Sequence, residues 1–113
     1  MHEMSLMASI FDILTRHLED YPGVTVKKVT LRIGSLTNAV PEALEFCFSA
    51  FAQGTVVEGA QLEIIQVPIK IKCRECQQES EPVEFHFRCP GCGSLAVDVT
   101  QGRELALESM EVE

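Results

Sequence analysis

The chain has 113 residues, of which 46% are hydrophobic and 23% are charged, and its formal net charge is −8 at pH 7. This length suits one ordinary domain or two very small ones, and the composition is that of a folded protein. The acidic balance argues against nucleic-acid partners, because affinity for a phosphate backbone comes from Lys and Arg. No apolar run approaches the roughly 20 residues that cross a membrane, so we expect a cytoplasmic protein without membrane contacts.

The first half of the chain predicts two amphipathic helices with a strand between them. In the first helix, residues 4–20, the apolar face consists of Met7, Ile10, Phe11, Leu14 and Leu18. Residues 24–34 alternate as a β-strand, and a slip at Lys27 and Lys28 suggests a bulge. The second helix is expected between Pro41 and Gly54. Its apolar face consists of Leu44, Cys47, Phe48 and Phe51.

The second half predicts strands on either side of a cysteine-rich segment. Residues 62–71 alternate as one strand, with Ile65, Val67, Ile69 and Ile71 in a single phase. After the cysteines come a strand at 95–99, a turn near Gly102 and a last alternating run over 104–113. The phase of this run changes between Leu107 and Met110. We therefore expect it to begin beside the cysteine segment and to finish as an extra strand of the main sheet.

Four of the five cysteines form two CxxC pairs, Cys73 with Cys76 and Cys89 with Cys92. Two such knuckles can surround Zn²⁺ with a tetrahedron of sulfur, and a site filled by four protein ligands leaves no open position for chemistry. One competing interpretation is a thiol redox motif, although that needs a single CxxC at the start of a helix. The other is a zinc ribbon that binds nucleic acid or protein, and acidic residues around the knuckles weigh against nucleic acid.

The N-terminus carries a second candidate metal site, because His2 stands beside the terminal amine. Met1 should be retained before so bulky a second residue. The α-amine has a pKa of about 8, so a metal can displace its proton near neutrality. The amine and the next backbone nitrogen close a chelate ring, the imidazole adds a nitrogen, and the Glu3 amide or carboxylate can complete the set. Such a nitrogen-rich plane suits Ni²⁺ or Cu²⁺ far better than Mg²⁺ or Ca²⁺.

Three further residues are given ordinary roles. His17 lies outside the main apolar stripe of the first helix and is expected to be solvated. Cys47 is expected to be a small core residue. His86 lies in the loop between the knuckles and can approach the metal, but four sulfurs already complete the site.

The predicted fold class is α+β: a small mixed sheet with two helices on one face, plus an inserted zinc-ribbon module. The first domain is expected over residues 1–69, completed by a C-terminal strand at about 106–113. The zinc-binding domain is expected over residues 70–105. The chain should not be an enzyme, since the one well-defined motif is a closed metal site.

Several stretches of the sequence, taken together, resemble one known family. These are MHEMSL at 1–6, RIGSL at 32–36, PEALEF at 41–46, GTVVEGA at 54–60, both CxxC pairs, and EVE at 111–113. From end to end, the chain is similar to the HypA/HybF family, nickel chaperones that mature [NiFe] hydrogenase. The resemblance implies an α/β nickel-binding domain with an attached zinc domain, in agreement with the division expected from the residues.

The resemblance also implies ligands and partners. Nickel is assigned to His2, with Met1 and Glu3 contributing through nitrogens of the same terminus, and zinc is assigned to Cys73, Cys76, Cys89 and Cys92. The implied activity is delivery of Ni²⁺ to the hydrogenase large subunit with a maturation GTPase. In some bacteria the implied client includes urease, with its accessory proteins. We expect a monomer or a homodimer.

Overall fold

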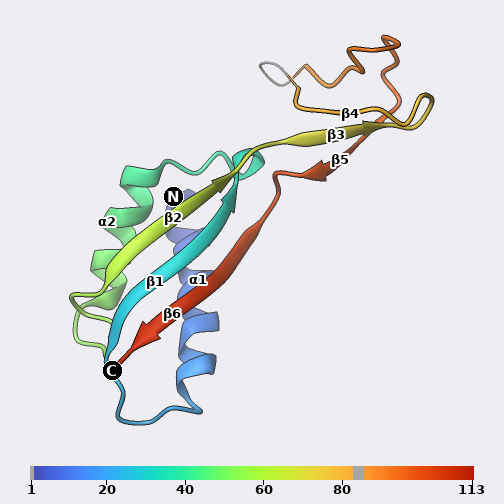
Figure 1. Ribbon diagram of the computed structural model, residues 1–113. Helices are drawn as coiled ribbons and strands as arrows, with labels where there is room; N and C mark the ends of the chain where they lie inside the picture. The colour runs from blue at the N-terminus through green and yellow to red at the C-terminus, as the bar shows by residue number, and fades with distance from the viewer. Residues whose placement is uncertain (1, 83–85) are drawn as a thin grey trace.

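The computed structural model describes residues 2–82 and 86–113, so Met1 is the one predicted ligand outside the described residues. Within them the chain forms two α-helices, one short 3₁₀ turn and six strands (Figure 1). In chain order these are α1 (His2–Leu18), β1 (Val26–Gly34), η1 (Ser35–Thr37), α2 (Pro41–Ala52), β2 (Gln61–Val67), β3 (Lys70–Cys73), β4 (Glu79–Ser80), β5 (Val97–Gln101) and β6 (Leu105–Val112).

The larger sheet has the strand order β2-β1-β6. Strand β1 runs parallel to β2 and antiparallel to β6, so the sheet is mixed. Parallel neighbours need a crossover connection, and α2 supplies it between β1 and β2. Both helices cover the same face of this sheet (Figure 1). The predicted α+β class, with two helices on one face of a small mixed sheet, is confirmed.

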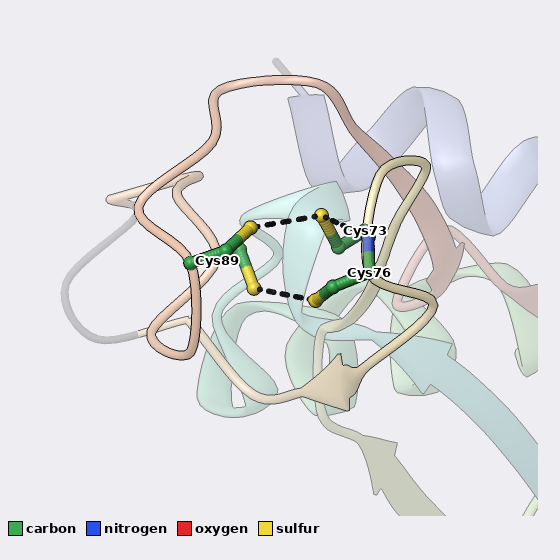
Figure 2. A group of neighbouring side chains, drawn as sticks. Cys73, Cys76 and Cys89 are labelled. Atoms are coloured by element: carbon green, nitrogen blue, oxygen red, sulfur yellow. Dashed lines mark hydrogen bonds between the residues drawn. The ribbon is translucent and has the colours of Figure 1, made fainter.

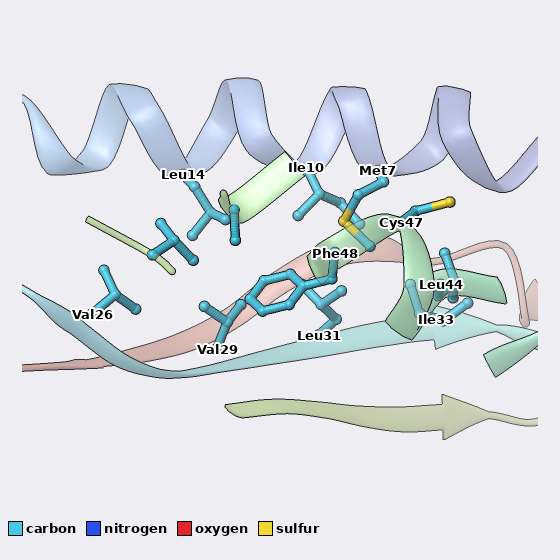
Figure 3. Close-up of a cluster of buried hydrophobic side chains, with 12 residues drawn as sticks. Met7, Ile10, Leu14, Val26, Val29, Leu31, Ile33, Leu44, Cys47 and Phe48 are labelled. Carbon is cyan, nitrogen blue, oxygen red and sulfur yellow. The ribbon is translucent and has the colours of Figure 1, made fainter. Parts of the chain in front are cut away.

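We call the two helices together with the larger sheet the body of the molecule. Its core lies between the helices and the sheet. Figure 3 shows side chains of α1 pointing toward those of β1, and these residues belong to one buried cluster. The rings of Phe11 and Phe48 lie 5.6 Å apart, and those of Phe11 and Phe51 lie 5.4 Å apart, which joins the two helices. All nine residues predicted on the two apolar helix faces belong to the cluster or pack against it.

The predicted strand over 62–71 is wrong as a single element. Strand β2 ends at Val67, and β3 begins at Lys70 in a different sheet. Pro68 lies between them, and proline cannot donate the hydrogen bond that a continuing ladder needs. The predicted alternation, which is set by Ile65, is also wrong within β2. Ile65 is 37% exposed, and the residues of the opposite phase, Leu62 and Ile64, pack against the core.

The phase change in the last run comes from a bulge. The whole of β6 pairs with β1, from Leu105 opposite Ile33 to Val112 opposite Val26, which confirms the extra strand predicted on the main sheet. The phase change is therefore not a passage from one sheet to the other. The register shifts because Thr30 pairs with Ser109, while the next residue of β1, Leu31, pairs with Leu107. A second shift between Val26 and Lys28 confirms the bulge predicted there.

The smaller sheet has the order β4-β3-β5, with β3 antiparallel to both neighbours. It projects from one end of the larger sheet (Figure 1). The molecule is accordingly 56 Å long, and its radius of gyration is 17.4 Å. A compact chain of this length would have a radius of gyration of about 13 Å. No helix within the described residues is long and apolar enough to span a membrane.

Candidate metal centres

The two CxxC segments fold into the same turn twice. In the first, Gln77 N–H donates to the Cys73 carbonyl at 3.0 Å, and Cys73 N–H donates to the Gln78 carbonyl at 2.9 Å. In the second, Gly93 N–H donates to the Cys89 carbonyl at 2.9 Å, and Cys89 N–H donates to the Ser94 carbonyl at 2.9 Å. Gln77 and Gly93 occupy equivalent places and both have positive φ, 68° and 76°. Each turn directs a pair of thiols to one side.

The four thiols converge on one point, and Figure 2 shows the two knuckles facing each other. The sulfur atoms of Cys73 and Cys92 lie 3.6 Å apart, and those of Cys76 and Cys89 lie 3.5 Å apart. All four sulfurs lie within 4.8 Å of one another. A tetrahedral zinc with bonds of about 2.3 Å would place its sulfurs about 3.8 Å apart, whereas a disulfide bond is about 2.05 Å long. The spacing therefore fits a four-coordinate zinc and no disulfide.

The electrostatics of the cluster also favour a cation. The Cys76 N–H donates to Cys73 Sγ at 3.4 Å, and this hydrogen bond is the main reason that the pKa of Cys73 falls to about 7. At Cys92 the Ser94 N–H acts to lower the pKa. The Cys73 sulfur, desolvation and the other two thiols outweigh it and raise the pKa to about 12. Four thiols this close cannot all ionise unless a cation offsets their mutual repulsion, and a coordinated divalent metal does so.

The start of α1 forms the second candidate site. The exposed His2 ring contacts the Thr37 carbonyl through Nε2. The Glu3 carboxylate accepts a hydrogen bond of 3.2 Å from the Val40 N–H, which is the main cause that lowers the pKa of Glu3. The first N–H groups of a helix have no intrahelical acceptor. The backbone nitrogens of residues 2 and 3 are therefore free of helical hydrogen bonds, while both side chains are held by the segment after β1.

The structure separates the predicted residues into these two groups. Among the residues that the structure describes, the one cluster of potential metal-ligating side chains consists of the four cysteines, and His2 and Glu3 are not part of it. His86 is exposed and outside the cluster, and His17 is exposed on α1. Cys47 is buried in the core as predicted, with its thiol 3.1 Å from the Met4 sulfur.

Sequence reasoning missed the segment that holds His2 and Glu3. Thr37 and Val40 carry no metal-ligating pattern, and they interact with the chain start through backbone groups. The only available signal is that RIGSL, at 32–36, ends directly before this segment.

Comparison with known proteins identifies the family. The HypA family model, described as a metallochaperone of hydrogenase and urease nickel incorporation, matches residues 1–112. The chain belongs to the HypA family. A hydrogenase maturation factor HypA from Desulfitobacterium hafniense is 50% identical over 113 residues, which cover 100% of this chain and 99% of the relative. The corresponding factor from Aquifex aeolicus is 38% identical, with 100% of this chain and 98% of the relative covered.

Solved structures of the HypA family share the fold. The solution structure of the Ni metallochaperone HypA from Helicobacter pylori matches with a TM-score of 0.71 and 26% identity, covering 98% of this chain and 97% of that one. A second HypA solution structure matches with a TM-score of 0.72 and 25% identity, covering 100% and 97%. The predicted resemblance is confirmed, and membership places the chain among the nickel metallochaperones of hydrogenase maturation.

Proposed function

We propose that this protein carries Ni²⁺ at its N-terminus and delivers it to the large subunit of [NiFe] hydrogenase, while the four cysteines hold a structural Zn²⁺. The observation that carries the proposal is the start of α1, where His2 and Glu3 are each held by a backbone group of the segment after β1. We assign nickel to the amine of Met1, to His2 and to Glu3. We assign zinc to Cys73, Cys76, Cys89 and Cys92.

Nickel ligation at this place has to overcome one unfavourable effect. The N-terminal end of a helix carries partial positive charge and disfavours a cation. However, each backbone N–H proton that Ni²⁺ displaces leaves a negative nitrogen and cancels one unit of the ion's charge. The backbone nitrogens at the start of α1 lack helical hydrogen bonds and can act in this way. The Glu3 carboxylate already accepts the Val40 N–H, which favours its backbone nitrogen as the ligand atom.

The two sites differ in how they would release a metal. His2 is exposed, so an incoming set of ligands can reach an ion bound there. At the cysteine cluster, four protein ligands fill a tetrahedron, and two of the four, Cys73 and Cys89, are buried. We infer that nickel is the transferable cargo and zinc the resident ion. A closed zinc site offers no position for substrate, so the protein acts without catalysis.

The proposal includes the division of the chain and its partners. Residues 1–69, with a C-terminal strand at about 106–113, form the nickel-binding domain, and residues 70–105 form the zinc-binding domain. The partners are the hydrogenase large subunit and a maturation GTPase in the cytoplasm. Because the family description names urease beside hydrogenase, urease is included as a second client, with its accessory proteins.

A nickel titration tests the assignment. Zinc-loaded protein that begins with Met1 should bind one Ni²⁺ per chain and show the absorbance of planar nickel. Replacing His2→Ala, or adding one residue before Met1, should abolish this binding and leave zinc content and circular dichroism unchanged.

His17→Ala is the matched control, since His17 is an exposed histidine on the same helix. It should bind nickel as the unaltered protein does. Stoichiometric nickel in both the His2→Ala and the extended protein would refute the proposed site.

A further inference from the structure

The turn η1 and the residues after it lie directly against the proposed nickel ligands. The Thr37 carbonyl contacts Nε2 of the His2 ring, and the two residues are 35 positions apart in the chain. We propose that the Thr37 carbonyl is a positioning group for nickel, which holds the His2 ring in one orientation and in the tautomer that leaves Nδ1 unprotonated for the ion. This inference rests on the proposed nickel site and adds to it an element that touches no metal.

The chemistry of the contact determines the tautomer. A carbonyl oxygen only accepts hydrogen bonds, so the Nε2 atom that contacts it must carry the proton. In the neutral ring the lone pair then belongs to Nδ1. Nδ1 is also the nitrogen that can close a six-membered chelate ring with the backbone nitrogen of His2, because Nε2 lies on the far side of the ring. The contact therefore presents the one nitrogen that the chelate can use.

The Thr37 carbonyl is itself held in place. The Thr37 hydroxyl donates to the Gly34 carbonyl at 2.8 Å and accepts from the Ala39 N–H at 3.4 Å. Across the same turn, Asn38 N–H donates to the Ser35 carbonyl at 3.2 Å. Asn38 has a φ of 57°, a left-handed conformation that asparagine tolerates better than most residues. A histidine that binds a metal commonly donates its other ring N–H to such a fixed acceptor.

The turn η1 also forms hydrogen bonds with both segments of the chain that connect the two sheets. The Leu36 N–H donates to the Gly102 carbonyl at 2.8 Å, where β5 leads into β6. The Ser35 hydroxyl donates to the Val67 carbonyl at 3.2 Å, at the end of β2. The acceptor for His2 is thus held by hydrogen bonds at the end of the larger sheet, although α1 itself begins with an exposed residue.

The competing explanation is that the contact between Thr37 and His2 only holds the start of α1 in place. The neighbouring contact between Val40 and Glu3 provides a control for it. Val40 N–H holds Glu3 in the same segment, and Val40 has a φ of −88°. Val40→Pro removes this donor with little change of backbone conformation and leaves the acceptor for His2 in place. A tether would be weakened equally by the loss of either contact, whereas the orientation and tautomer of the His2 ring depend on Thr37.

The first test is made on the unaltered, nickel-free protein. Nitrogen-15 NMR of the histidine rings should show His2 as the tautomer with Nε2 protonated at a pH where the ring is neutral. His17, exposed on the same helix, is the internal reference for a solvated ring. A His2 ring that has Nδ1 protonated, or that matches the tautomer mixture of His17, would overturn the inference.

The second test measures nickel affinity. Thr37→Val removes the hydroxyl that fixes the turn, so the His2 ring should lose its fixed orientation and nickel binding should weaken about tenfold, the lower end of the range for losing such a supporting contact. Thr37→Ser should restore affinity, and Val40→Pro, which frees the Glu3 side chain but leaves the contact of His2 in place, should weaken nickel binding less than Thr37→Val does. Equal losses in Thr37→Val and Val40→Pro, or no loss in Thr37→Val, would contradict the inference.

His2→Ala distinguishes a failure of the proposed nickel site from a failure of the role proposed for Thr37. If it abolishes nickel binding while Thr37→Val has no effect, the proposed nickel site stands and the inference about Thr37 fails. If His2→Ala binds nickel normally, the proposed site is wrong and the inference falls with it.

Discussion

The two sheets of this molecule are stabilised in different ways. The larger one has two helices against its face and, among the described residues, a core of twelve buried ones. In the smaller one, the buried side chains among the described residues from Lys70 to Gln101 are Ile71, Cys73 and Cys89. A unit of fewer than about 40 residues rarely builds a sufficient apolar core and usually needs a metal or disulfides. The comparison shows that the body has its own apolar core, and we infer that the projecting sheet depends on a metal at its four cysteines.

Removal of zinc is the largest perturbation that the comparison predicts. Structural zinc contributes an apparent binding free energy of about 10–16 kcal/mol in small zinc modules. A strong chelator, or Cys73→Ser, should therefore abolish amide protection over residues 70–101 and leave the protection of β1 and α1 intact. Hydrogen exchange measures both regions in one sample. Cys47→Ala is the matched control, since Cys47 lies in the body, and it should retain zinc. Loss of protection in both regions at once would contradict the separation.

A cavity in the core of the body tests whether the larger sheet can be destabilised without affecting the cysteine sheet. Leu31 is completely buried between β1 and the helices. Leu31→Ala should lower the free energy of unfolding of the body by about 2–5 kcal/mol, from lost burial and an unfilled cavity. Denaturant titration followed by far-ultraviolet circular dichroism measures this change, while zinc content should stay at one ion per chain. Loss of zinc at the same denaturant concentration as the body would indicate that the sheets unfold as one unit.

Gly34→Ala would alter the connection between the two regions. A Cβ atom on Gly34 would lie 2.0 Å from the Gly102 carbonyl oxygen and 2.6 Å from the Glu104 nitrogen, so the backbones must move apart. Overpacking of this kind costs about 1–3 kcal/mol. We expect amide shifts in β6 and in η1, recorded by NMR. Gly54→Ala is the control, because Gly54 has positive φ but open space around it, and its effect should stay local.

A surface ion pair should have the smallest effect. Lys28 and Glu63 pair at 3.4 Å between β1 and β2, and their side chains are 27% and 48% exposed. Lys28→Ala should change the free energy of unfolding of the body by about 1 kcal/mol or less. Thermal unfolding at low and high salt measures it. A cost as large as that of Leu31→Ala would show that polar contacts, and not apolar burial, dominate the body.

The elements that could be predicted from the sequence are those with a local signal. Helix α1 repeats its apolar residues with helical periodicity, and this pattern alone indicates the buried face that includes Ile10 and Leu14. The cysteine cluster could be predicted because two CxxC turns carry their geometry with them wherever the chain places them. The signal for each of these features lies within a short stretch of the sequence.

The features that could not be predicted depend on distant parts of the chain. The apolar alternation runs across Pro68 unchanged, so the pattern hides the change of sheet, and the proline is the local signal that marks it. The bulge in β6 reflects its register against β1. The contact of His2 with Thr37 exists because the end of β1 lies beside the start of α1, and it uses a backbone carbonyl that every residue has.

The central claim is that two metals occupy two separate sites, with nitrogen ligands for nickel and sulfur ligands for zinc. X-ray absorption at the nickel and zinc edges, on protein that begins with Met1 and carries one ion of each metal, tests it most directly. We predict a nickel shell without sulfur and a zinc shell of four sulfurs at about 2.3 Å. Sulfur around nickel, or zinc released as nickel binds, would contradict the account.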